Sequence, residues 1–268
     1  MPEQPYTGLA TTFDTAAELY ARVRPSYPEP LFADLALLTG LTTADTEVVE
    51  IGPGTGQATR GLLSRGWKVT GIEPGPELAA VARRELAGLG DVEIIVSPFE
   101  HWDSGQRSGY DLVFAATSWH WLDPGVAYPR AAELLRPGGH LAVVATEHVL
   151  PDDGDDFFRQ VGRAYQAVGM SERHDVPAAP SQIADPDVAA MTASGLFEAP
   201  AVRRYVWSQA YSTQGYLDLL STYSGHIAAP TQQRDELFAQ IRRLIEATTT
   251  KSVRRHYLTM LQVARRAD

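Results

Sequence analysis

Three glycines and two glutamates stand where two apolar segments of the chain end. Gly52, Gly54 and Gly56 follow a short apolar run. Glu50 stands two positions before the first of them, and Glu73 ends the next apolar run. Glycine weakens regular elements, so its crowding at a junction indicates a tight turn or a close approach of another group to the backbone. Backbone N–H groups in such a turn can hold a polar ligand, and a strand-end carboxylate can accept hydrogen bonds from both hydroxyls of a ribose. These residues together predict a nucleoside site.

The spacing of the glycines separates two classes of cofactor. The dinucleotide fingerprint G-x-G-x-x-G needs a glycine where this chain has Gln57 or Thr59. The charge of Glu50 also disfavours a neighbouring pyrophosphate and suits a cofactor with a positive charge. A nicotinamide-dependent oxidoreductase therefore stays an alternative, and a non-catalytic protein that binds an adenosyl cofactor is another.

A parallel sheet would bring these residues together. Apolar runs alternate with helical patterns, which predicts strands at 47–52, 68–74, 92–100, 110–118 and 140–148. Such alternation with short connections is typical of a doubly wound α/β sheet, in which ligands bind beyond the carboxyl ends of the strands. Within this pattern, residues 1–45 form a helical lead-in and 46–148 a cofactor-binding core.

After position 148 the alternation ends. We expect helices that form a lid or substrate region at 149–198 and 210–250, and closing strands at 199–209 and 255–266. The prediction is one domain over 1–268: a mostly parallel, seven-stranded sheet of Rossmann-like type, with the helical lid over its ligand edge.

The composition narrows the classes of function. The formal net charge of −10 disfavours binding to nucleic acids. The chain contains no cysteine, which excludes disulfides, thiolate nucleophiles and zinc sites built from cysteine. The first residues are not typical of a secretory signal, and we expect no membrane-spanning segment, because no apolar stretch reaches about 18 residues. We expect a cytoplasmic monomer or homodimer that binds neither nucleic acid nor membrane and uses no metal.

Four segments resemble a known family. The stretches "VVEIGPGTGQAT", "VTGIEPGPEL", "YDLVFAATSWHWLDP" and "LLRPGGHLAVV" look like the successive motifs of class I S-adenosylmethionine-dependent methyltransferases. The lead-in "FDTAAELYARVRPSYP" is similar to that of the small-molecule branch that includes trans-aconitate methyltransferase. The resemblance covers residues 10–148. It implies S-adenosylmethionine as cofactor, S-adenosylhomocysteine as product, and in-line methyl transfer to a small acceptor.

The resemblance also implies contacts with the methionine part of the cofactor. Gly52, Gly54 and Gly56 would line it. Glu50 would lie near its amino group, and Ala116 would offer backbone contacts near the sulfonium.

Other positions match residues that hold the rest of the cofactor in this family. Glu73 would hold the ribose hydroxyls, Pro74 would lie against the adenine, and the backbone N–H of Phe99 would meet the adenine ring. Tyr20 and Arg24 would close over the methionine carboxylate.

His120 is the candidate catalytic base. The segment "SWHW" places it just after the strand at 110–118, at the ligand edge. The alternative is that His120 packs or hydrogen-bonds within its loop. Glu147 and His148, at the end of the strand at 140–148, are weaker candidates. The alternative for them is that they are ordinary polar residues at a strand end that face the solvent. The sequence leaves open the acceptor, the methylated atom (oxygen, nitrogen or carbon) and whether a base is needed.

Overall fold

A seven-stranded sheet forms the centre of the protein, in the strand order β3-β2-β1-β4-β5-β7-β6. The computed structural model describes residues 16–105, 109–151, 156–170 and 176–268. The strands are β1 (Glu47–Ile51), β2 (Lys68–Glu73), β3 (Val92–Val96), β4 (Tyr110–Ala116), β5 (Leu135–Val149), β6 (Ala201–Ser212) and β7 (Ser252–Arg265). The first five pair in parallel, and β7 lies antiparallel between β5 and β6. The predicted fold class, an α/β fold with a mostly parallel sheet, is confirmed.

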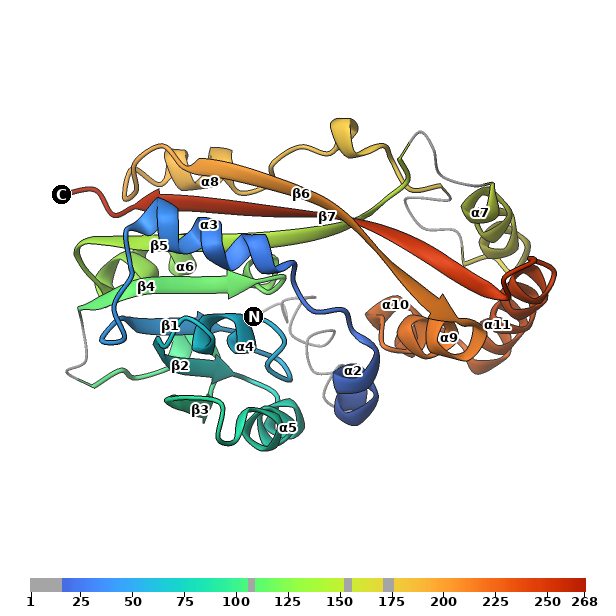
Figure 1. The fold of residues 1–268 in the computed structure, drawn as a ribbon, viewed down its shortest axis with the longest axis horizontal. Helices are drawn as coiled ribbons and strands as arrows, with labels where there is room; N and C mark the ends of the chain where they lie inside the picture. The colour runs from blue at the N-terminus through green and yellow to red at the C-terminus, as the bar shows by residue number, and fades with distance from the viewer. Residues whose placement is uncertain (1–15, 106–108, 152–155, 171–175) are drawn as a thin grey trace, which may run out of the picture.

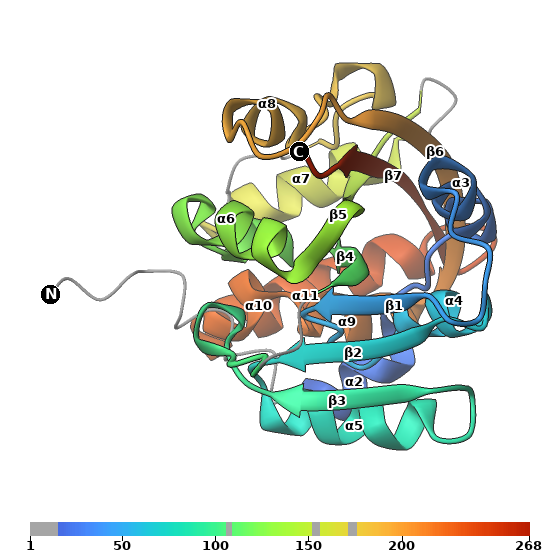
Figure 2. The same ribbon diagram turned by 90° about the vertical axis from the view of Figure 1, so that its left-hand side faces the viewer.

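Helices cover both faces of the sheet (Figure 2). One face packs against α3 (Glu29–Thr39), α4 (Thr59–Leu63) and α5 (Pro76–Leu86). The other face packs against α6 (Pro124–Leu134) and α8 (Val188–Ala193). Successive side chains of a strand point to opposite faces. Because helices cover both faces, the central strands β1 and β4 are buried on both sides, and their sequences are nearly continuous apolar runs.

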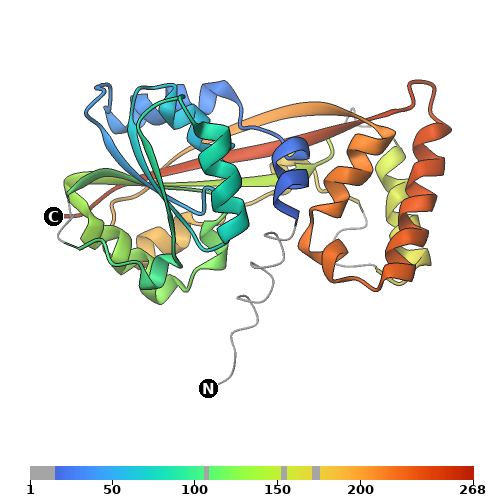
Figure 3. The same ribbon diagram turned by 90° about the horizontal axis from the view of Figure 1, so that it is seen from below.

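A second group of helices lies beyond the carboxyl ends of the parallel strands, at the right of Figure 1 and Figure 3. It consists of α7 (Phe157–Ala167), α9 (Thr213–Ser221), α10 (Ser224–Ala228) and α11 (Thr231–Glu246). Its apolar residues form a core separate from those of the sheet faces. The region predicted as a lid at 149–198 thus divides, because α7 joins this group whereas α8 packs on the sheet.

The three strands β5, β6 and β7 extend past the others toward these helices (Figure 1). Pairing of β5 with β4 stops at Val144, but β5 continues beside β7 to Val149. We call this extension the ribbon; it comprises residues 145–149, 204–212 and 252–260. Because β7 is antiparallel to its neighbours, the ribbon places residues from the end of the chain in front of the glycine turn that follows β1.

No helix in the described part of the chain has the length and apolar content needed to cross a membrane. The same residues hold no group of three or more His, Asp or Glu side chains placed to bind a metal ion. The expected absence of a metal from the reaction stays a prediction.

Candidate functional site

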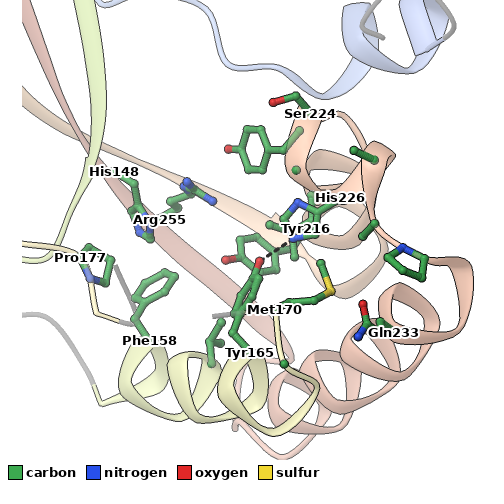
Figure 4. Close-up of a pocket in the computed structure, with 18 residues that line it drawn as sticks. His148, Phe158, Tyr165, Met170, Pro177, Tyr216, Ser224, His226, Gln233 and Arg255 are labelled. Atoms are coloured by element: carbon green, nitrogen blue, oxygen red, sulfur yellow. Dashed lines mark hydrogen bonds between the residues drawn. The ribbon is translucent and has the colours of Figure 1, made fainter. Parts of the chain in front are cut away.

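Two adjoining cavities open beyond the carboxyl ends of the parallel strands. The turn cavity, of about 290 Å³, lies between the glycine turn after β1, the segment from α2 (Ala17–Val23) to residue 27, and the ribbon. The lid cavity, of about 730 Å³, is lined by residues of α7, α9 and α10 and by the ribbon (Figure 4). His148, Tyr223 and Arg255 line both cavities.

Two of the three predicted glycines line the turn cavity. Gly52 has a φ of 65°, and a Cβ there would lie 2.7 Å from the Cβ of Ser118. Gly54 donates its N–H to Oε2 of Glu73 at 2.9 Å. Gly56 does not line the cavity. A Cβ there would lie 3.0 Å from side-chain atoms of Leu86, so a glycine at this position is explained by the close packing of α5.

Three residues predicted to hold the adenosyl part lie outside the turn cavity. Glu73 is 4% exposed, and Oε1 accepts the N–H of Gly75 at 2.9 Å. Its two oxygens therefore order the turns after β1 and β2. Pro74 is exposed. Phe99 is buried in the core on the α6 face, and the guanidinium carbon of Arg130 lies 5.6 Å from the centre of its ring.

Glu50 is a buried carboxylate that lines the turn cavity. It is 1% exposed, and its Oε2 has no hydrogen-bond partner. Burial raises the pKa of Glu50 to about 7; the nearby hydroxyl of Thr59 opposes this shift, and the charge of Glu73 makes a smaller contribution to it. A buried oxygen without a partner is costly unless a ligand supplies a hydrogen-bond donor or a positive charge. Glu50 therefore marks a place for a cationic group.

Tyr20 and Arg24 line the turn cavity at α2 and just after it. The guanidinium of Arg24 lies between the rings of Tyr20 and Tyr223, 4.6 and 4.4 Å from their centres. Arg24 also donates from Nε to Oγ1 of Thr222 at 2.9 Å, and from Nη2 to the carbonyl of the same residue at 2.8 Å. The lead-in is thereby joined to the end of α9 across the turn cavity.

The end of β4 contributes one predicted and one unpredicted residue. Ala116, the last residue of β4, lines the turn cavity as expected from its position. Thr117, which follows it, has a φ of 58°, an uncommon value for a β-branched residue. Its Oγ1 is 2.9 Å from the hydroxyl of Tyr27, and both residues line the turn cavity. No local sequence pattern predicts this contact, which joins residues 90 positions apart.

The two candidate histidines occupy different places. His120 is exposed, its ring centre is 4.8 Å from that of Trp121, and it lines neither cavity. His148 lies on the ribbon opposite Tyr257 and lines both cavities. Its Nε2 has no hydrogen-bond partner. Burial, and then the charges of Arg255 and His256, hold the pKa of His148 well below its ordinary value, so it is neutral at pH 7.

Arg255 was not singled out by the sequence. It lies on β7, two positions before Tyr257, so both side chains are on one face of the ribbon. It is 8% exposed, and its guanidinium carbon is 5.4 and 5.5 Å from the ring centres of Tyr223 and Tyr257. The strand pattern at the end of the chain was visible, but nothing in it indicated which cavity the strand would reach.

Comparison with known proteins connects this arrangement to one family. A family model described as a methyltransferase domain matches residues 49–143. An uncharacterized methyltransferase of Mycobacterium tuberculosis is 30% identical over 241 residues, which is 88% of this chain and 86% of that protein.

Solved structures agree in fold. A proposed type II methyltransferase from Anaeromyxobacter dehalogenans has 21% sequence identity and a TM-score of 0.65, over 90% of this chain and 97% of its own. Phosphoethanolamine N-methyltransferase 2 of Haemonchus contortus, solved with S-adenosyl-L-methionine, has 15% identity and a TM-score of 0.50, over 100% of this chain and 58% of its own. These two likenesses show the shared fold, and the mycobacterial relative shows the family. The chain belongs to the S-adenosylmethionine-dependent methyltransferases, and S-adenosylmethionine is its cofactor.

Proposed function

We propose that this enzyme transfers a methyl group from S-adenosylmethionine to a small-molecule acceptor bound in the lid cavity. The observation that carries the proposal is that the two cavities adjoin along His148, Tyr223 and Arg255. The bound cofactor supplies a methyl group activated by a positively charged sulfur. The protein then has to orient the acceptor atom and exclude water, and orientation alone can lower a barrier by about 7–11 kcal/mol.

The residues of the turn cavity fit the methionine end of the cofactor. The unpartnered Oε2 of Glu50 suits its ammonium group. Gly52 and Gly54 leave space where a side chain would narrow the turn, and Gly56 lets α5 pack behind it. In this proposal Arg24, covered by Tyr20, holds the carboxylate, and Ala116 lies near the sulfur.

The adenosyl end is proposed to lie along the sheet edge from the end of β2 to the short helix η2 (Phe99–His101). Glu73 would bind the ribose hydroxyls, with Pro74 and Phe99 beside the adenine. Glu73 supports this role because it is the carboxylate at the end of the strand next to β1, where nucleosides are held in such sheets.

A base is needed only if the acceptor atom must lose a proton. We propose His148 for this step, because it lines both cavities, is neutral and has an unpartnered Nε2. His120, the candidate from the sequence, lies outside both cavities and stays the alternative.

The setting of the enzyme is also part of the proposal. A chain without cysteine is compatible with the cytoplasm, and the net charge of −10 disfavours a nucleic-acid acceptor. We further propose a monomer or homodimer, and a place in the branch that includes trans-aconitate methyltransferase, which the lead-in resembles.

Calorimetric titration with S-adenosylhomocysteine tests the function. The wild-type protein is expected to bind one equivalent, and Glu73→Ala to bind at least about tenfold more weakly, because hydrogen bonds to a charged group contribute about 1.5–3 kcal/mol. Glu93→Ala, an exposed carboxylate on the neighbouring strand β3, is the matched control. Equal affinity in Glu73→Ala removes Glu73 from the ribose site. If the wild-type protein binds NAD but does not bind S-adenosylhomocysteine, the proposed methyl transfer is contradicted.

A further inference from the structure

The lid cavity has one permanent charge among its described lining residues, the guanidinium of Arg255. Burial lowers the pKa of both lining histidines, that of His226 to about 4, so they are neutral at pH 7. Burial also raises the pKa of Tyr165 and that of Tyr216, so their hydroxyls stay protonated. A ligand in this cavity therefore meets a positive charge and, among the described lining residues, no negative one.

Arg255 is a buried positive charge with no carboxylate beside it among the described residues. Its Nε has no hydrogen-bond partner, and no ion pair joins it to a carboxylate within the described ranges. Its polar neighbours are tyrosine hydroxyls, of which that of Tyr216 forms a hydrogen bond with the guanidinium, and none of them carries a negative charge at pH 7. A buried charge is strongly disfavoured unless it is paired. An arginine retained in this environment indicates that a ligand brings the opposite charge.

The rest of the lid cavity is suited to an apolar body. Phe158, Val161 and Leu220 line it, and Figure 4 shows Phe158, Tyr165 and Tyr216 around the space beside His148 and Arg255. The hydroxyl of Tyr165 is 2.7 Å from Nε2 of His226, which ties α7 to α10 across the cavity. A volume of about 730 Å³ lies in the range of pockets that enclose small organic ligands.

We infer that the acceptor is an organic anion, whose carboxylate or phosphate group binds the guanidinium of Arg255 and whose apolar or aromatic body lies under α7 and α9. The inference rests on the proposed function and names the substrate class of the same site. The planar guanidinium presents several donors that match the oxygens of either anion. The same charge opposes an acceptor with an ammonium group at this place.

The test uses four small probes with one aromatic ring each: phenylacetate, phenyl phosphate, the neutral phenylacetamide and the cationic phenethylamine. Calorimetric titrations are done on the protein saturated with S-adenosylhomocysteine, for wild type, Arg255→Met and Arg254→Met. Arg254 is the matched control because it neighbours Arg255 on β7, is exposed and carries the same charge.

We expect at least one of the two anions to bind wild type and Arg254→Met at least about tenfold more tightly than the amide, and the amine to bind least. Arg255→Met is expected to lose that discrimination, and Arg255→Lys to recover part of it. Equal binding of anion and amide by wild type overturns the inference. So does unchanged discrimination in Arg255→Met, or no detectable binding of either anion.

Thermal unfolding without ligand separates a binding role from a structural one. If Arg255 is kept for a ligand, Arg255→Met unfolds at or above the wild-type temperature, because an apolar side chain replaces an unpaired buried charge. A large fall in that temperature, absent from Arg254→Met, assigns Arg255 to the fold and overturns the inference.

Titration with S-adenosylhomocysteine alone distinguishes the two proposals. No binding to wild type defeats the proposed function. Normal binding to wild type, with more than about a tenfold loss in Arg255→Met, shows that Arg255 holds the cofactor instead, and then the inference about the acceptor fails alone.

Discussion

The turn cavity and the lid cavity are neighbours built in different ways. The turn cavity has one wall that the parallel sheet itself positions, formed by the glycine turn after β1 and the end of β4. The lid cavity is lined mainly by residues of helices whose apolar core is separate from those of the sheet faces, with the ribbon on its remaining side. Substitutions in the wall of the turn cavity therefore disturb the sheet, whereas residues of the lid helices can be substituted without a change in the sheet.

The buried charges of the two cavities are also opposite. Glu50 is buried in the turn cavity, and Arg255 is buried where the two cavities adjoin. Neither forms an ion pair within the described ranges. Glu50 thus suits a cationic group of the cofactor in the turn cavity, and Arg255 suits an anionic acceptor in the lid cavity. The predictions below test whether this division holds.

Gly52→Ala should cause the largest loss of stability. Its positive φ costs alanine about 1–2 kcal/mol, and the close approach to Ser118 adds about 1–3 kcal/mol of overpacking. We expect chemical denaturation to show a loss of about 3 kcal/mol in the free energy of unfolding. Gly40→Ala is the matched control, because Gly40 has a φ of 69° and nothing lies within 4 Å of the added Cβ. Equal losses in the two variants would show that the approach of Ser118 has no importance.

Glu50→Gln should alter stability in a pH-dependent way. Burial raises the pKa of folded Glu50 to about 7 from its ordinary 4.5, so the folded state holds the proton more tightly than the unfolded state. Wild-type stability therefore falls as the pH rises from 4.5 to 7, by about 3 kcal/mol, and the cost is complete above pH 7.

The glutamine variant lacks this ionisation. It should match wild type at pH 4 and exceed its free energy of unfolding by about 3 kcal/mol at pH 8, while binding S-adenosylhomocysteine at least about tenfold more weakly. Glu47→Gln, at the exposed start of β1, is the control for both measurements. A Glu50→Gln protein with normal affinity would remove the ammonium group from the neighbourhood of Glu50.

His148→Asn should slow turnover by about a hundredfold if the acceptor atom must lose a proton. Affinity for S-adenosylhomocysteine should change little, because a polar side chain remains at the site. His120→Ala is predicted to leave cofactor binding nearly normal. If His120 is the base, this variant releases S-adenosylhomocysteine more slowly than wild type; equal turnover removes His120 from catalysis. A greater loss of kcat in His120→Ala than in His148→Asn would show that His120, and not His148, is the base.

Thr222→Val should have the smallest effect. It removes the hydroxyl that accepts a hydrogen bond from Nε of Arg24, a contact of about 1 kcal/mol that joins the lead-in to the lid helices. Affinity for S-adenosylhomocysteine should fall about fivefold. Thr248→Val is the matched control, since both hydroxyls donate to the carbonyl three residues earlier at 2.7 Å. An effect of equal size in both variants would indicate a general loss of helix stability.

Much of the turn cavity could be predicted because its signals are local. The apolar runs and the glycine turn lie within a few residues of one another, and six of the predicted cofactor residues line the cavity: Tyr20, Arg24, Glu50, Gly52, Gly54 and Ala116. Their roles toward the cofactor stay predictions. The choice of His120 depended on a weaker argument, that a residue just after a strand faces the ligand. In the structure, His120 lies in the short helix η3 (Trp119–Trp121), and its imidazole ring packs beside the ring of Trp121.

The sequence by itself determined the succession of strands and helices along the chain and the glycine turn after β1, because these depend on hydrophobic periodicity and on backbone conformations that only certain residues adopt. The class of cofactor followed from the resemblance of its motifs to a known family. Tertiary structure decided the rest. The antiparallel pairing of β7 between β5 and β6 brings His148 and Arg255 to one place. Contacts between residues a hundred positions apart leave no local pattern, since they are selected by packing of the whole chain.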